Sequence, residues 1–203
     1  MAQYNTIADI RKSLNGGGAR PNLFEVDIPE NGLFKYVGSD SQLDSRVLVK
    51  AAQLPASNVA SIDVPFRGRI MKVAGDRTFD TWTVTVINDV DFNLRTAFQN
   101  WMQQIAQYAD ATGEQDPQAY KSTATVTQLA RKSSNMSQTS DKGLVEAYTY
   151  DFFGIFPTNI SAIDLSYDTA DTIEEFTVEF QVDYWAPKGV NDTINGAPAS
   201  DGN

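Results

Sequence analysis

The stretch IEEFTVEFQVDYW, residues 173–185, alternates strictly between apolar and polar side chains. Because successive side chains of a β-strand point to opposite faces, this alternation predicts a long strand with one buried face and one polar face. The buried face would carry Phe176, Val178, Phe180, Val182 and Tyr184. The polar face would hold a row of carboxylates, those of Glu175, Glu179 and Asp183.

Similar strand patterns occur earlier in the chain. Residues 76–89 contain a run in which Trp82, Val84 and Val86 alternate with threonines, and these residue types suit a pleated surface. Further strands are predicted at residues 22–28, 45–55, 57–66, 68–75, 121–130, 144–157 and 159–167. Together these patterns predict a mainly β domain, a sandwich or a barrel.

One segment, residues 92–108, has a helical period instead. Its apolar side chains recur three or four residues apart and form one stripe: Leu94, Phe98, Trp101, Met102, Ile105 and Tyr108. Asp89 or Asp91 is the expected N-cap. An aromatic stripe could surround a cofactor, but a lone helix in a β protein must bury its apolar side, so packing on a sheet is the favoured interpretation.

The chain is expected to form one domain with two tails: a flexible N-terminal arm (1–20), the β domain (21–186) and a flexible C-terminal tail (187–203). Residues 29–42 are expected to be a loop or a loose hairpin, and residues 109–120 and 131–143 are expected to be polar loops. The sequence has no long apolar run typical of a membrane span, no secretion signal, and no cysteine for disulfides. The expected compartment is therefore the cytoplasm, or a particle assembled there.

The acidic charge is concentrated in the last third of the chain. The net charge is −10, and residues 144–203 contain 11 acidic residues and one basic residue, Lys188, while the remainder balances 15 acids against 15 bases. Nucleic-acid binders need a basic surface, so this distribution argues against that class and is compatible with a surface that repels nucleic acid.

The sequence offers little for catalysis. With no histidine and no cysteine, it excludes Ser-His, Cys-His and His-metal arrangements. The carboxylates of residues 175–183 could hydrolyse sugars, and DTADTIEE (168–175) could bind calcium, but a solvated strand face and an acidic turn are the simpler interpretations. We therefore expect no enzyme activity, no catalytic residue, no cofactor and no metal.

Five separated segments resemble the tail-tube proteins of contractile-tailed bacteriophages. They are GARPNLFEV (18–26), KAAQLPAS (50–57), VAGDRTFDTWTVTVIND (73–89), FPTNISAIDLSYD (156–168) and IEEFTVEFQVDYW (173–185). The resemblance implies two packed β-sheets with one flanking helix, in subunits that form hexameric rings. Stacked rings would form the hollow inner tube of a contractile tail, which surrounds the tape-measure protein during assembly and later conducts DNA.

The resemblance also implies partners and a location. The partners would be further copies of the chain, the sheath, the baseplate, the tail terminator, the tape-measure protein and DNA in passage, without a membrane. The protein would belong to the virion tail, assembled in the host cytoplasm. Related folds form the tubes of type VI secretion and phage-like bacteriocin particles, so a tube of another contractile injection system is an alternative. A soluble β-sandwich binding module is a further alternative.

A tube that passes DNA should not bind phosphate, and this gives the acidic strand a hypothetical role. Glu175, Glu179 and Asp183, with Asp63 and Asp164 as weaker candidates, would face the lumen. The alternative is that they face the outer solvent or a neighbouring subunit. The helix at 92–108 would cover the outside of the sheet, near the sheath. For contacts between subunits we expect an ion pair of Arg77 with Asp76 or Asp80 of a neighbour.

Overall fold

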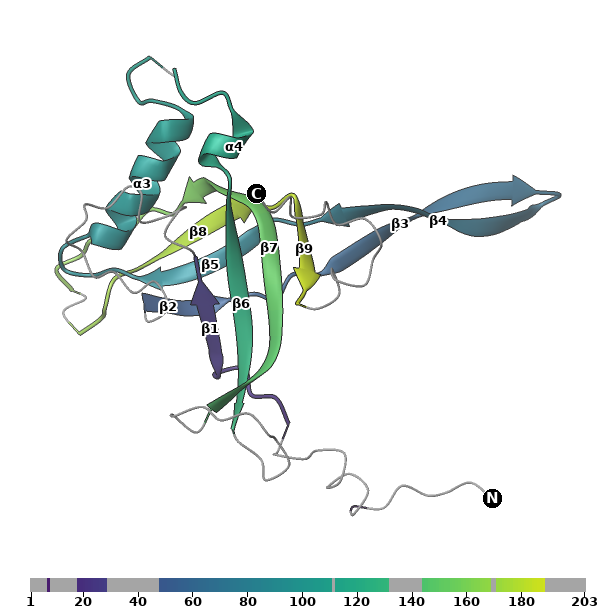
Figure 1. Ribbon diagram of the computed structural model, residues 1–203, viewed down its shortest axis with the longest axis horizontal. Coiled ribbons are helices and arrows are strands. Elements are labelled where there is room, and N and C mark those ends of the chain that lie inside the picture. Colours follow the sequence, from purple (N-terminus) through teal and green to yellow (C-terminus); the bar gives the residue numbers. More distant parts are fainter. Residues whose placement is uncertain are drawn as a thin grey trace, which may run out of the picture.

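The computed structural model describes residue 7 and residues 18–28, 48–110, 112–131, 144–168 and 171–188. Its strands are β1 (Phe24–Asp27), β2 (Val49–Ala52), β3 (Ser57–Phe66), β4 (Arg69–Phe79), β5 (Trp82–Ile87), β6 (Ser122–Arg131), β7 (Leu144–Ile160), β8 (Glu175–Gln181) and β9 (Tyr184–Pro187). Its helices are α3 (Asn93–Ile105) and α4 (Pro117–Tyr120). The predicted mainly β class is confirmed (Figure 1).

Two antiparallel sheets share the long strand β7. Its first part pairs with β6 and β9, and with β1 these strands form sheet A. From Phe156 onward β7 pairs with β8, and with β5 and β2 these strands form sheet B. Gly154 stands just before this change of partner with a φ of 66°, in a region that side chains with a Cβ avoid. The chain therefore turns from one sheet into the other at this glycine.

The core lies between the two sheets and helix α3. Trp82 of β5 stacks on Phe152 of β7 with ring centroids 4.5 Å apart. Phe180 of β8 is fully buried against Trp82 and against Phe98 and Trp101 of α3. Burying each of these rings contributes roughly 1.5–3 kcal/mol to folding. The aromatic stripe of the helix is thus used for packing, as its period predicts.

The ends of α3 differ from the sequence prediction. The helix stops at Ile105 because Ala106 is extended, and Tyr108 is exposed rather than part of the buried stripe. At its start, the Asp89 carboxylate accepts hydrogen bonds from the backbone N–H groups of Asn93 (3.2 Å) and Leu94 (3.5 Å). Asp89 therefore caps the helix, although Phe92 occupies the N-cap position.

Three other sequence predictions are wrong in detail. Residues 173–185 form two strands, because the chain bends after Gln181 and β9 crosses to pair with the first part of β7. Residues 159–167 are not a separate strand, since β7 runs through Ile160 and non-strand chain follows. The polar segment 109–120 contains α4, which begins at Pro117 with the Asp116 carboxylate accepting a hydrogen bond from a backbone N–H.

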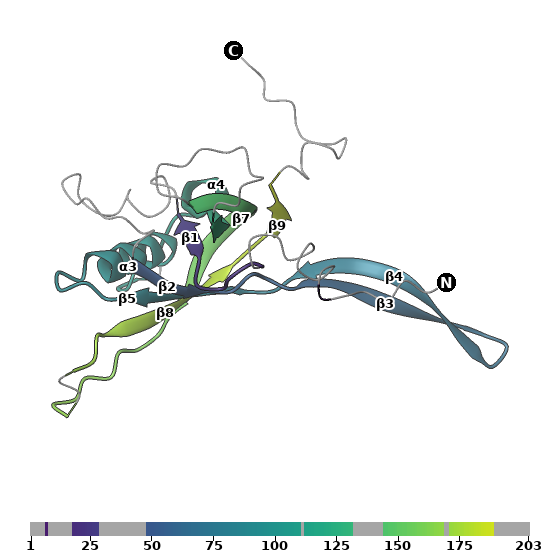
Figure 2. The same ribbon diagram turned by 90° about the horizontal axis from the view of Figure 1, so that it is seen from below.

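Strands β3 and β4 form a separate two-stranded hairpin that projects from the body. Figure 2 shows it extending to one side, while the segment between β7 and β8 projects on the other side. The predicted strand 57–66 matches β3, and β4 extends further than the predicted 68–75. Most of the predicted arms 1–20 and 187–203, and of the loops 29–42 and 131–143, lies outside the described residues.

Candidate functional site

The face of sheet B that points away from the core is polar. Its other face buries Trp82, Val84 and Val86 of β5 against the core, so the intervening residues of β5 and of β8 lie on the open face. The register sets Thr83 opposite Glu179, Thr85 opposite Thr177 and Ile87 opposite Glu175. Two of the predicted lumen acids, Glu175 and Glu179, therefore share one open sheet face with a set of threonines.

Charge on this face is partly balanced. The ammonium of Lys50 on β2 donates to the Glu175 carboxylate, while Glu179 forms no ion pair with another described residue. Exposed pairs of this kind contribute about 0–1 kcal/mol to stability. The sequence predicted a purely acidic row and did not predict Lys50 on this face. Lys50 of β2 lies near Glu175 of β8 only because β5 pairs with both of these strands.

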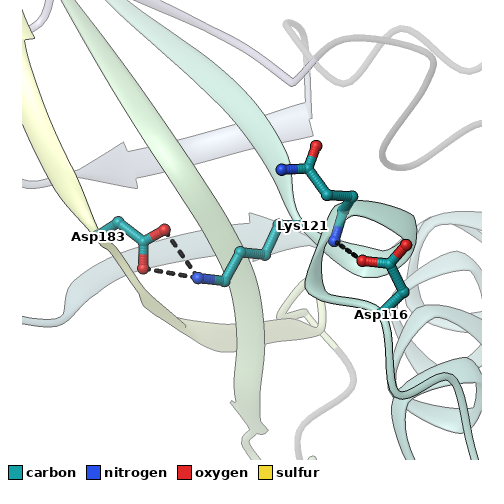
Figure 3. Close-up of polar contacts among 4 residues, drawn as sticks. Asp116, Lys121 and Asp183 are labelled. Carbon is teal, nitrogen blue, oxygen red and sulfur yellow. Dashed lines mark hydrogen bonds and ion pairs between the residues drawn. The ribbon is translucent and has the colours of Figure 1, made fainter.

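The third acid of the predicted row, Asp183, lies elsewhere. Its carboxylate oxygens accept from the Lys121 ammonium at 2.8 and 2.7 Å (Figure 3). Its backbone N–H donates to the Phe153 carbonyl. A Cβ on Gly154 would lie 2.0 Å from its Oδ2 atom, so the glycine gives the carboxylate its space. Asp183 holds the bend between β8 and β9 and does not continue the row of Glu175 and Glu179.

The two weaker lumen candidates also occupy different places. Asp63 is on β3 of the projecting hairpin, where its carboxylate accepts from Lys72 of β4 at 3.0 Å. Asp164 is exposed in the segment between β7 and β8, not on a strand beside Glu175. The structure therefore does not bring the five acids together on one surface.

The expected contact residues all lie at the base of the hairpin. Arg77 stands opposite Val59, next along β4 from Asp76, and Asp80 follows the strand. The Asp80 carboxylate accepts a hydrogen bond of 2.7 Å from Asn58 Nδ2. No ion pair joins Arg77 to either acid among the described residues, so the expected pairing with a neighbouring subunit stays a prediction.

Sheet B has two edges where no further strand pairs among the described residues. One is β2, which pairs only with β5. The other is the last part of β7: the pairing with β6 ends at Ile155, so Phe156–Ile160 pair with β8 alone. Unpaired strand edges offer backbone N–H and C=O groups to another chain. Sequence periodicity could not find these edges, because they depend on which strands become neighbours.

The described residues contain no group of three or more histidine, cysteine or acidic side chains able to hold a metal ion. The pKa of Asp110 lies below its usual value because the carboxylate accepts hydrogen bonds from the Thr112 hydroxyl and backbone N–H, but this is a solvent-exposed turn. In the described part of the chain, no helix is both long and apolar enough to span a membrane.

Residues 19–188 match the model of a protein family described as phage tail tube protein. The chain belongs to this family. It is 34% identical to tail tube protein gp19 of Enterobacteria phage T4 over 180 residues, which cover 88% of this chain and 98% of that protein. The predicted resemblance to tail-tube proteins of contractile tails is thereby confirmed.

Solved structures share the fold at much lower identity. One comes from the sixfold-symmetrised baseplate of the anti-feeding prophage, with a TM-score of 0.56, 9% identity, and coverage of 85% of this chain and 97% of that chain. Another comes from the sheath–tube complex of an extracellular contractile injection system, with a TM-score of 0.52, 15% identity, and coverage of 91% and 98%. Both support the two-sheet architecture.

Membership of the family establishes the general role. The protein is a tail tube protein, a structural component of the virion, and not an enzyme. The expected virion location is therefore confirmed.

Proposed function

We propose that six copies of this tail tube protein close into a ring through the edges of sheet B, and that the rings stack into a hollow tube for DNA ejection. The observation that carries the proposal is the pair of unpaired edges, β2 and residues Phe156–Ile160 of β7, on opposite sides of one four-stranded sheet. Joining unlike edges in turn generates a closed ring without free edges. The sixfold symmetry of the related baseplate supports the number of subunits.

In such a ring, the polar face of sheet B would form the inner wall. One face of the sheet is buried under helix α3 and sheet A, so the open face with Glu175, Glu179 and the threonines is free to line the bore. A mildly acidic wall repels phosphate, and the Lys50 ammonium on it is already paired with Glu175. We retain Glu175 and Glu179 as lumen acids and omit Asp183, which lies in the bend beyond the end of β8 and not on the open face of that strand.

The remaining partners follow from the same arrangement. Helix α3 covers the sheet on the side away from the proposed bore, which is where a contractile sheath would surround the tube. The baseplate and tail terminator would contact the two ends of the stack, and the tape-measure protein would occupy the bore before DNA. The related sheath–tube complex supports the contact with a sheath, and the related baseplate structure supports the contact with a baseplate.

Electron microscopy tests the proposal directly. The purified chain is concentrated at near-neutral pH, with and without tail baseplates as nucleating seeds. We expect six-membered rings or hollow tubes, and a reconstruction in which β2 pairs with the end of β7 of the next subunit. Persistent monomers with seeds present, or rings joined through other surfaces, would refute the proposal.

The lumen assignment has its own test in assembled tubes. Glu179→Lys places a cation on the proposed wall, whereas Glu146→Lys places one on an exposed position of sheet A. We expect tubes of the first variant to retain double-stranded DNA at low salt, while wild-type and Glu146→Lys tubes do not. Equal DNA retention by the two variants would place Glu179 outside the bore.

A further inference from the structure

The middle of sheet B is regular, but its edge strand β2 is not. Strands β5 and β8 pair residue by residue along the whole of β5. Strand β2 has four residues, and the two steps from Val49 to Ala51 match a single step along β5, so Lys50 is the extra residue of a β-bulge. The Lys50 ammonium is held over the sheet by the Glu175 carboxylate. This edge is therefore short, bulged and charged.

The other edge, the end of β7, carries a second bulge. The two steps from Pro157 to Asn159 match a single step along β8, so Thr158 is the extra residue here. The Thr158 hydroxyl donates to the Glu179 carbonyl at 3.1 Å, and this side-chain hydrogen bond ties the bulge to β8. Both edges that the proposed ring joins are thus interrupted, although the strands between them are not.

The backbone nitrogen of Pro157 faces the unpaired edge. The Ser161 N–H donates to the Thr177 carbonyl at 2.8 Å, so Thr177 directs its backbone groups toward β7. Because these groups alternate in direction along a strand, Glu179 also faces β7, and Phe180 faces β5. Pro157 lies opposite Phe180, so its nitrogen points away from β8, and this nitrogen carries no proton. One donor that a second strand would use is missing from this edge.

These features are the ones by which natural sheets keep exposed edges from pairing with other chains. Short strands, lysine, proline and bulges all reduce such pairing. All four occur at the seam, by which we mean the pairing of β2 of one copy with Phe156–Ile160 of the next. Two free subunits share a single seam, and an isolated two-stranded contact is marginally stable in water. A subunit that adds to a tube also contacts the ring beneath it, which raises the effective concentration of its edges.

We propose that Pro157 and the bulged Lys50 slow the formation of the seam between free subunits, so that the seam forms rapidly only on an existing ring. The partner is a second copy, because the two irregular edges lie at opposite sides of one sheet and are the edges that a closed ring must join. This inference rests on the proposed ring and specifies how its closure is regulated. The features that weaken the seam in solution are tolerated in the tube, where further contacts hold each subunit.

Assembly with and without seeds tests the role of Pro157. Pro157→Val restores an N–H on the edge and keeps an apolar side chain at this buried position. The appearance of hollow tubes is followed by electron microscopy after the purified protein is concentrated, with or without tail baseplates as seeds. Without seeds, the lag before tubes appear should shorten at least about tenfold. With seeds, the elongation rate should stay within about threefold of the wild-type rate. A folded variant with the wild-type lag would overturn the proposal.

Pro187→Val is the matched control for the restored N–H. Pro187 lies on β9, which pairs with β7 in sheet A and is not part of the seam. Its replacement should leave the lag before tube formation unchanged. If Pro187→Val shortens the lag as much as Pro157→Val, the effect does not come from the seam and the proposal is wrong.

Lys50 provides a second, independent variant. Lys50→Val removes the charge from the edge and should shorten the unseeded lag, whereas Lys50→Arg keeps the charge and should retain it. Urea denaturation of the monomers shows which variants fold, and Lys50→Val decides the matter if Pro157→Val does not. If wild-type protein adds nothing to baseplates, the proposed ring itself is refuted. If wild type grows on baseplates and the folded variants keep its lag, the ring stands and its edges do not regulate closure.

Discussion

Replacing Gly154 by alanine should destabilise the subunit strongly, for a reason visible in the structure. A Cβ at this position would meet Asp183 Oδ2 at 2.0 Å and Cγ at 2.5 Å, and the φ of 66° is itself unfavourable for alanine. Holding alanine at this positive φ costs about 1–2 kcal/mol of the free energy of unfolding. Forcing the Asp183 side chain from its rotamer costs a further ~0.5–1.5 kcal/mol. Weakening its partly exposed pair with Lys121 adds about 0.2–1 kcal/mol.

The expected total loss is about 2–4 kcal/mol in the free energy of unfolding, measured by urea denaturation of the monomer. With a slope of about 2 kcal/mol per molar urea, the midpoint should fall by roughly 1–2 M. Removing the obstacle with Asp183→Ala should recover about 1–2 kcal/mol of the effect of Gly154→Ala in a double-mutant cycle.

Gly68→Ala is the matched control for the backbone term alone. Gly68 has a φ of 80°, but a Cβ there would meet no atom within 4 Å. Its replacement should therefore cost less than that of Gly154. The reasoning would be refuted if the two alanine variants lost equal stability, or if Asp183→Ala left the cost of Gly154→Ala unchanged.

Three further outcomes are expected. Phe180→Ala should lower the free energy of unfolding, measured by urea denaturation, by about 3–5 kcal/mol, because the ring is fully buried among three other aromatic rings. Phe180→Leu should lower it clearly less. Asp89→Ala should cost about 1 kcal/mol, whereas Asp89→Asn keeps most of the cap; a loss equal in both variants would contradict the capping role. The pKa of the Asp110 carboxyl group is lowered, so its hydrogen bonds to Thr112 are present above pH 3.8, the ordinary pKa value. These bonds are lost as the pH falls through the lowered pKa. An NMR titration of Asp110 with a midpoint at or above 3.8 would contradict this.

Local patterns in the sequence determined much of this fold. Alternation placed Phe176, Val178 and Phe180 on the buried face of β8, and a helical period placed Phe98 and Trp101 in the core. Both follow from backbone geometry, since strands repeat every two residues and helices every 3.6. The same alternation put Glu175 and Glu179 together on the opposite face of β8.

Long-range pairing decided what periodicity could not. The bend after Gln181 arises because β9 pairs with the first part of β7, and it removes Asp183 from the row of acids. Lys50 reaches Glu175 from a strand 125 residues away in sequence. Such contacts depend on which strands become neighbours, and a local pattern of side chains carries no information about a distant partner. For this protein the sequence by itself determined the faces of the strands, while only the tertiary structure decided their edges and the surfaces left uncovered.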